Sequence, residues 1–266
     1  MDDNVLTIGY LQCEDLKEYL PEQVYFLSGG YPDMAQSMFD YVTSLPLETL
    51  KTESPGDENT KLPKIKIKSF DVKKGVYPEK LDIYAGFIIS GSLSGVYDGD
   101  PWIDALLTFV KTLQSENRKM VGISFGHQII AKALGGHVEK NPKGSEISRV
   151  TVPLTDVAKE YFKTTRDTFS LLYHHNDALV SLPDAACSIG SSRSTQYQGF
   201  ILGKHILCFC GHPDYSHHPA VLEALFKWDS ENLVVPQQLL DFGLTTLHHK
   251  TDYLWVTVQI IKFFMN

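Results

Sequence analysis

The sequence lacks the features that identify several broad classes of protein. No apolar run reaches the roughly 18 residues that a membrane span requires. Basic residues are also scarce, with 24 Lys and Arg against 32 Asp and Glu, so the net charge is −8. Because a phosphate backbone is bound by a basic patch, we expect neither nucleic acid nor a membrane as a partner. The first residues, Met1 to Asn4, are acidic where a secretory leader would be basic, so none is expected.

Cysteine is rare as well. The four cysteines lack the spacing of a disulfide framework or of a paired Cys-x-x-Cys zinc site. They are Cys13, Cys187, Cys208 and Cys210. This usage indicates a reducing compartment, and we expect a cytoplasmic protein. Hydrophobic residues make up 43% of the chain, which is enough for a full core without disulfide bonds or a structural metal.

What the sequence does contain is an alternation of apolar runs and amphipathic stretches. Strands are expected at 5–11, 65–70, 83–90 and 120–123, with helices at 34–45, capped by Asp33, and at 103–113. This order is typical of an α/β fold with a mostly parallel sheet flanked by helices, which binds ligands beyond the carboxyl ends of its strands. After Gly136 we expect an antiparallel extension, with strands at 148–152, 168–173, 185–191, 197–202 and 205–209.

The tail of the chain is expected to be helical. Pro236 should begin a long amphipathic segment that continues through Ile261. The charged stretch at about 50–64 predicts a mobile surface loop. We therefore predict one domain over 1–235 and a C-terminal helical extension over 236–266 that packs on it.

A candidate nucleophile lies in Gly122-Ile123-Ser124-Phe125-Gly126, between a buried strand and a helix over 128–134. Two glycines let the backbone turn sharply and lift the side chain of Ser124 above the sheet. Small residues are common at such turns, so the pattern needs supporting context. The neighbouring His127 is expected to be a helix residue whose ring is satisfied locally.

A candidate base and its carboxylate lie together at the end of a later strand. His212 precedes Asp214 by two residues, so one loop can present an imidazole and the acid that orients it. Cys208, Cys210 and His212 alternate, which would place them on one face and leaves a three-ligand zinc site as an alternative.

Several motifs, taken in order, resemble the class I glutamine amidotransferases. They are Gly-Ile-Ser-Phe-Gly-His-Gln at 122–128, Leu-Gly-Gly at 134–136 and Gly-His-Pro-Asp at 211–214. The stretches at 31–34, 89–98, 101–103 and 173–177 are similar to those of the stand-alone GMP-synthase-like branch, which includes γ-glutamyl peptidases. The resemblance covers about 6–226. It implies a flavodoxin-like fold that uses no cofactor and no metal.

The resemblance also implies a mechanism and a set of roles. In this family a cysteine attacks the γ-carboxamide of glutamine, releases ammonia, and leaves a glutamyl thioester that water hydrolyses. By position, Ser124 stands at the nucleophile, His212 at the general base, and Asp214 at the orienting acid, which is usually glutamate. The backbone amides of Gly91 and Phe125 would form the oxyanion hole. Contacts to the substrate would come from Gln128, His174, Asn176 and Asp177.

Serine at position 124 departs from the family pattern. A thiol, with an ordinary pKa of about 8.5, is readily ionised beside a histidine, whereas a hydroxyl loses its proton only during attack. Three explanations stay open. Ser124 is an engineered replacement, a natural residue in a protein that lost catalysis and kept its pocket, or a natural nucleophile.

We therefore predict a glutamine amidotransferase-like protein that hydrolyses a γ-glutamyl amide or peptide bond, impaired by Ser124. The alternative is a non-catalytic γ-glutamyl-binding or regulatory protein. In either case the partner is a small γ-glutamyl compound. Any transfer of ammonia would require a separate acceptor subunit, because the chain shows no synthase domain.

Overall fold

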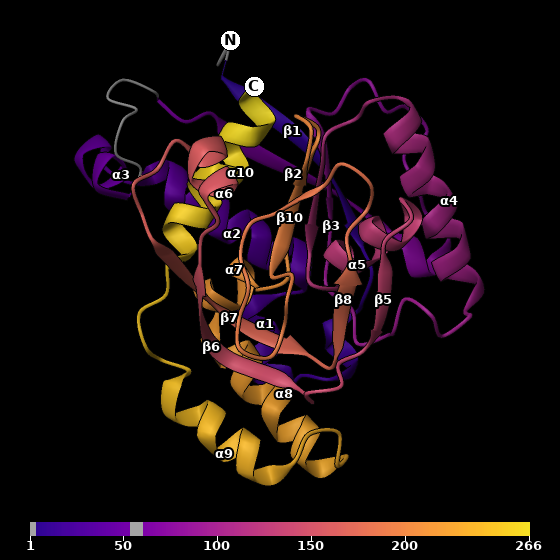
Figure 1. Ribbon diagram of the computed structural model, residues 1–266, viewed down its shortest axis with the longest axis vertical. Coiled ribbons are helices and arrows are strands. Elements are labelled where there is room, and N and C mark those ends of the chain that lie inside the picture. The colour runs from indigo at the N-terminus through magenta and orange to yellow at the C-terminus, as the bar shows by residue number, and fades with distance from the viewer. Residues whose placement is uncertain (1–3, 54–60) are drawn as a thin grey trace.

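A seven-stranded sheet forms the centre of the protein in the computed structural model, which describes residues 4–53 and 61–266 (Figure 1). Its order is β2-β1-β3-β4-β11-β10-β9. The strands are β1 (Val5–Gln12), β2 (Lys64–Asp71), β3 (Gly86–Ile89), β4 (Met120–Ile123), β9 (Cys187–Ser188), β10 (Gly199–Leu202) and β11 (Ile206–Phe209). The pairs from β2 to β11 are parallel, and β10 and β9 are added antiparallel. The mostly parallel sheet predicted from the sequence is confirmed.

Two small antiparallel sheets form the extension expected after Gly136. β6 (Glu146–Pro153) pairs with β7 (Thr168–His175), and β5 (His137–Lys140) pairs with β8 (Asp177–Ser181). The strand expected at 185–191 is wrong in extent, because only the two residues of β9 are extended. Ala185 has a φ of 62°, in the left-handed region, and this turn shortens the strand.

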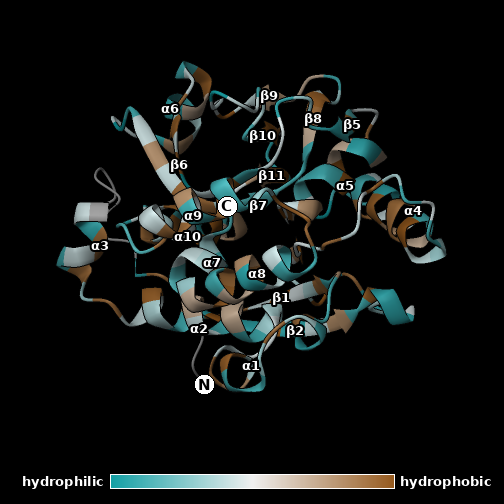
Figure 2. Ribbon diagram, turned by 90° about the horizontal axis from the view of Figure 1, so that it is seen from below, coloured by the Kyte–Doolittle hydropathy of each residue, from teal (hydrophilic) through white to brown (hydrophobic). Residues whose placement is uncertain are grey.

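Helices cover both faces of the central sheet. α4 (Pro101–Ser115) and α5 (Phe125–Ala133) lie on one face, and α2 (Tyr31–Ser44), α7 (Pro213–His217) and α10 (Tyr253–Met265) lie on the other. The remaining helices are α1 (Glu22–Ser28), α3 (Leu47–Glu53), α6 (Asp156–Phe162), α8 (Pro219–Glu231) and α9 (Gln237–Thr246). Figure 2 shows both hydrophilic and hydrophobic segments on these helices, as expected for amphipathic elements.

The period-two alternation of a strand explains the two cores. On β1, Tyr10 belongs to the hydrophobic cluster that includes Phe39 and Trp255, whereas the next residue, Leu11, belongs to the cluster that includes Ile103 and Ile129. Successive side chains point to opposite faces, so each strand feeds both cores. The candidate site lies beyond the ends of these strands, and its polar side chains lie outside both cores.

Three helix boundaries differ from the sequence prediction. α5 begins at Phe125, three residues before the predicted start at 128, because the turn at Ser124 leads directly into the helix. α2 begins at Tyr31, so Asp33 is not its N-cap; its carboxylate accepts a hydrogen bond from the backbone N–H of Gly30 at 2.9 Å. The tail is two helices instead of one, because Asp252 fixes the chain between α9 and α10. Its carboxylate accepts hydrogen bonds from the backbone N–H and the hydroxyl of Ser170, both at 2.8 Å.

The loop predicted at about 50–64 is only partly covered by the structure. α3 continues to Glu53, so the first residues of that range are helical, and residues 54–60 lie outside the described residues. The division of the chain at residue 235 stays a prediction. Over residues 4–53 and 61–266, no helix is long and apolar enough to span a bilayer.

Candidate functional site

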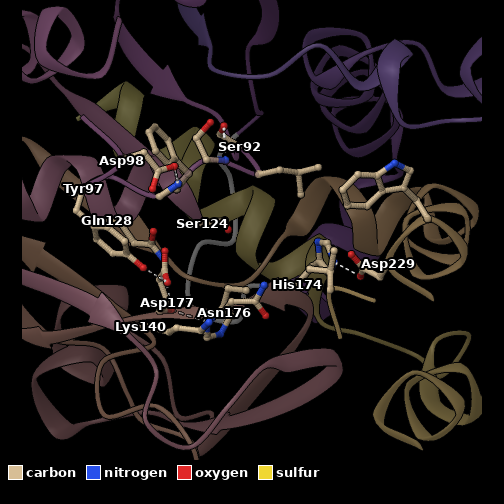
Figure 3. Close-up of a pocket in the computed structure, with 17 residues that line it drawn as sticks. Ser92, Tyr97, Asp98, Ser124, Gln128, Lys140, His174, Asn176, Asp177 and Asp229 are labelled. Carbon is tan, nitrogen blue, oxygen red and sulfur yellow. Dashed lines mark hydrogen bonds and ion pairs between the residues drawn. The ribbon is translucent and has the colours of Figure 1, made fainter. Parts of the chain in front are cut away.

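The parallel strands deliver the candidate residues to one edge of the sheet. Ser124 follows β4 and His212 lies three residues after β11, and these two strands pair with Phe209 opposite Ile123. The backbone N–H of Ser124 donates to the carbonyl of Phe209 at 2.9 Å. A cavity of about 370 Å³ opens at this edge, with Ser124 in its wall (Figure 3). The fold therefore places the candidate nucleophile where doubly wound sheets bind ligands.

Ser124 occupies a strained turn. Its φ is 53° and its ψ is −110°, which is an uncommon conformation for a residue with a side chain. The flanking glycines allow this turn to pack. A Cβ on Gly126 would lie 2.0 Å from the carbonyl oxygen of Ile89, and a Cβ on Gly122 would lie 2.6 Å from the backbone of Gly126. The sharp strand-to-helix elbow expected from the sequence is present.

His212 is held by Asp214. The ring Nδ1 lies 3.0 Å from Asp214 Oδ1, and both side chains are buried. Because an ionised carboxylate only accepts, Nδ1 carries the proton and Nε2 of a neutral ring keeps its lone pair. The ring stacks on Tyr215 with the centroids 4.0 Å apart, and the Tyr215 hydroxyl is hydrogen-bonded to that of Tyr31. The shorter aspartate arm still reaches the imidazole.

Two backbone amides are unpaired among the residues described, as the donors of an oxyanion hole must be. The N–H groups of Phe125, the first residue of α5, and of Gly91 have no hydrogen-bond acceptor within the described part of the chain. The backbone at Gly91 is held in place by Ser90. The hydroxyl of Ser90 donates to the Gly91 carbonyl at 2.9 Å and accepts from the Cys13 N–H at 2.8 Å. A Cβ on Gly91 would lie 2.8 Å from His212 Cε1, so only glycine fits there.

One end of the cavity is a linked polar cluster. Tyr97 donates its hydroxyl hydrogen to Asp177 Oδ1 at 2.6 Å, and Gln128 Nε2 donates to the Asp177 carbonyl at 3.3 Å. Burial raises the pKa of the Asp177 carboxyl, the charge of Asp98 raises it further, and the Tyr97 hydrogen bond opposes both. This end offers carboxylate and amide groups suited to an amino acid head group.

The predicted binding residues do not all lie at that end. Asn176, Gln128 and Asp177 line the cavity, as does His174, but His174 Nε2 lies 2.7 Å from Asp229 Oδ2 on α8. Figure 3 shows His174 and Asp229 on the opposite side of Ser124 from Gln128 and Asp177. The structure thus brings the predicted residues to one cavity and divides them between its two ends.

A buried network beside the cavity was missed by sequence reasoning. The carboxylate of Glu146 accepts hydrogen bonds from Ser192 at 2.6 Å, from Gln198 at 2.5 Å and from Ser194, and it lies 3.1 Å from His175 Nε2. Burial would raise the pKa of Glu146, but these bonds and the charge of His175 lower it to about 2. The donors come from separate segments, so no local motif could reveal the network.

His175 itself carries a proton on both ring nitrogens. Its Nδ1 lies 2.8 Å from the carbonyl oxygen of Asp177, which can only accept, and its Nε2 faces the Glu146 carboxylate. Burial would lower the pKa of His175, but Cys210 and Glu146 outweigh it and raise the pKa well above the usual value. The protonated ring therefore donates a hydrogen bond to the backbone carbonyl of Asp177 and fixes its position.

Two other expectations from the sequence are wrong. The ring of His127 is not satisfied locally, because it is fully buried and neither nitrogen has a hydrogen-bond partner among the residues described. Cys208 and Cys210 do not share a face, since β11 ends at Phe209 and the two thiols belong to different hydrophobic clusters. Nor does any group of three or more His, Cys, Asp or Glu in residues 4–53 and 61–266 have the geometry of a metal site.

Comparison with known proteins identifies the family. The family model for glutamine amidotransferase class-I matches residues 59–229, which is more than half of the chain. The protein therefore belongs to the class-I glutamine amidotransferase family, as the motifs had predicted.

Individual relatives agree with this assignment. A glutamine amidotransferase-like protein of Schizosaccharomyces pombe is 32% identical over 205 residues, covering 75% of this chain and 81% of its own. Gamma-glutamyl peptidase 2 of Arabidopsis thaliana is 37% identical over 152 residues, covering 55% of this chain and 61% of that protein. The crystal structure of a glutamine amidotransferase from Thermotoga maritima has the same fold, with a TM-score of 0.71 at 17% identity, and covers 98% of this chain and 99% of its own.

Proposed function

We propose that the protein binds γ-glutamyl compounds in this cavity and hydrolyses a γ-glutamyl amide or peptide bond, slowly, through Ser124, His212 and Asp214. The strained elbow at Ser124 carries the proposal, because it lifts a nucleophile-type side chain at the strand edge where an oriented His212–Asp214 pair also lies. The γ-glutamyl peptidase name of a relative supports the choice of bond.

The proposed steps follow from the roles assigned to these residues. Nε2 of His212 takes the proton of Ser124 as the hydroxyl oxygen attacks the carbonyl carbon. The amides of Gly91 and Phe125 stabilise the negative charge that develops on the carbonyl oxygen. As the tetrahedral species collapses, His212 gives its proton to the departing amine. Water then hydrolyses the glutamyl ester on Ser124, with His212 acting as the base again.

Serine limits the rate in this site. A hydroxyl must be deprotonated during attack, whereas a thiol at the same place would be partly ionised beforehand. An oxygen is also smaller than a sulfur, and a misplacement of about 1 Å can cost roughly a hundredfold in rate. We therefore expect turnover well below that of the cysteine variant.

A second candidate function is non-catalytic binding of γ-glutamyl ligands. It is favoured by the two departures from the family pattern, serine at position 124 and aspartate at position 214. The cluster of Gln128, Tyr97 and Asp177 does not involve the Ser124 hydroxyl, so binding does not depend on it. Under either function we propose a cytoplasmic protein, and a separate acceptor subunit wherever ammonia is transferred.

The test measures glutamate release from glutamine and from a panel of γ-glutamyl peptides by the parent protein, Ser124→Cys and Ser124→Ala. We expect slow release by the parent, at least tenfold faster release by Ser124→Cys and none by Ser124→Ala. Activity of the cysteine form alone would favour the binding protein. If no form releases glutamate from any of these compounds, and the Ser124→Ala protein binds none of them, both candidate functions are wrong.

A further inference from the structure

The cavity continues past Ser124 to an end formed by β7 and α8. His174 is the second-last residue of β7, and Trp228 and Asp229 lie near the end of α8. Figure 3 places His174 and Asp229 across Ser124 from Asp177. A substrate whose γ-glutamyl head group contacts Asp177, with its scissile carbonyl at Ser124, would extend its leaving part toward this second end.

His174 and Asp229 form a second imidazole–carboxylate pair. Asp229 has an exposed fraction of 0%, and its Oδ2 lies 2.7 Å from His174 Nε2. Since the carboxylate only accepts, it fixes a proton on Nε2 and leaves Nδ1 of the neutral ring as an acceptor. No hydrogen bond to Nδ1 occurs within the described residues, and His174 lines the cavity.

The carboxylate of Asp229 is only partly satisfied by the residues that the structure describes. Asp229 Oδ1 has no hydrogen-bond partner in the described part of the chain, although the atom is buried. A buried carboxylate normally has further donors or a counter-charge. The cavity wall contains three aspartates against two cations. These are Lys140, which lies beside Asn176 in Figure 3, and His175, whose charge faces Glu146. The end of the cavity near Asp229 therefore favours positive charge.

The rest of this end is apolar. Trp228 is half-buried and is held by an edge contact with Tyr19, with the ring centroids 5.2 Å apart. Val234, after α8, also lines the cavity. The two side chains provide a surface for a short hydrocarbon chain that ends at the His174–Asp229 pair.

We propose that this end is a subsite for the leaving group, and that the His174–Asp229 pair selects γ-glutamyl amides whose amine part carries an N–H donor on a short apolar chain. The proposal rests on the proposed binding of γ-glutamyl compounds. His174 accepts the N–H hydrogen bond and Asp229 supplies the negative charge behind it. A carboxylate on the leaving part is disfavoured, because it would face the same charge.

The test is isothermal titration of the Ser124→Ala protein, which cannot turn over, with three ligands. γ-Glutamyl-1,4-diaminobutane carries an ammonium group, γ-glutamylbutylamide has the same chain without it, and γ-glutamylglycine carries a carboxylate. A charge-assisted hydrogen bond should give the diamine compound roughly tenfold tighter binding than the butylamide. The glycine compound should bind most weakly.

Variants then assign the preference. Asp229→Asn, which keeps the shape of the side chain, and His174→Gln should each reduce the ratio of the two dissociation constants to within twofold. Asp98→Asn removes a carboxylate at the opposite end and controls for the general loss of charge, so its ratio should stay above fivefold. Thermal unfolding establishes that each variant is folded.

The outcomes separate the two proposals. If the three ligands bind with nearly equal dissociation constants, the proposed leaving-group subsite is wrong, while the proposed γ-glutamyl site stands. A ratio that survives both Asp229→Asn and His174→Gln also overturns the subsite. If none of the ligands binds, and L-glutamine does not bind either, the proposed function itself fails.

Discussion

His127 makes the stability of the protein depend on pH in a way that one substitution can isolate. Its ring is fully buried in α5, and neither nitrogen has a partner in the described residues. Burial, and then the charge of His175, lower its pKa from 6.5 to about 3. The folded protein therefore keeps this imidazole neutral at every pH above about 3.

The magnitude follows from proton linkage. Between pH 3 and pH 6.5 the unfolded chain binds a proton at His127 that the folded chain does not, so the free energy of unfolding falls as the pH falls. For an unfolded pKa of 6.5, His127 alone should lower the free energy of unfolding by about 2 kcal/mol at pH 5 relative to pH 8. His127→Leu removes the proton-binding group and keeps an apolar side chain of similar size.

The assay is urea unfolding of the parent and of His127→Leu at pH 8 and at pH 5. The parent should lose about 2 kcal/mol more than the variant between the two pH values. His249→Leu removes an exposed imidazole and serves as the control, with the same pH dependence as the parent. Equal losses for the parent and His127→Leu would refute the reasoning, because the ring would then have a partner or access to water.

Three further predictions concern the site and its surroundings. In the Ser124→Cys background, Asp214→Asn should lower kcat by roughly 10²–10⁴ with little change in KM, because His212 loses the acceptor that orients it. The control variant Asp241→Asn, which changes an exposed carboxylate, should leave kcat unchanged. Equal kcat values for the two variants in steady-state assays would contradict this role of Asp214. Glu146→Gln should lower the free energy of unfolding by about 3 kcal/mol above pH 5 in urea titrations. That difference should shrink as the pH falls toward about 2, because the carboxylate that contributes it becomes protonated there; a difference independent of pH would argue against the ionised network. Ser124→Gly should be more stable than Ser124→Ala by about 1 kcal/mol in the same assay, because glycine relieves the positive φ, and an alanine form of equal stability would show that the turn is not strained.

Features set by local pattern could be predicted from the sequence. The strand over Met120–Ile123 has the predicted bounds, because four consecutive apolar residues and a following glycine-rich turn leave little alternative. The elbow at Ser124 follows from the same stretch. The family motifs then lead to His212 and Asp214, which one loop delivers as a hydrogen-bonded pair.

Features set by contacts between distant segments could not be predicted. The break between α9 and α10 depends on hydrogen bonds from Ser170 to Asp252, which are 82 residues apart. The position of Asp229 beside His174 depends on how α8 docks against β7, and neither residue lies in a pattern that joins them. The hydrogen bonds that Glu146 accepts from Ser192 and Gln198 likewise join residues that no sequence pattern connects. Sequence reasoning thus names several residues of the cavity wall but not the contacts between distant segments that hold them in place.

The energetic cost of the elbow helps to decide between the two candidate functions. A serine in the left-handed region costs about 1–3 kcal/mol, and a glycine at the same position would avoid this cost. A protein that only binds γ-glutamyl ligands would gain nothing from the strain, because the contacts among Tyr97, Gln128 and Asp177 do not involve the hydroxyl.

The buried His212–Asp214 pair supports the same conclusion. A buried polar pair of this kind contributes little more to stability than apolar residues of the same size would, so stability alone does not account for it. The strained serine, the oriented imidazole and two amides without acceptors would each be of no benefit to a binding protein. Together they are what acyl transfer requires. Their presence at one strand edge favours slow hydrolysis over binding alone.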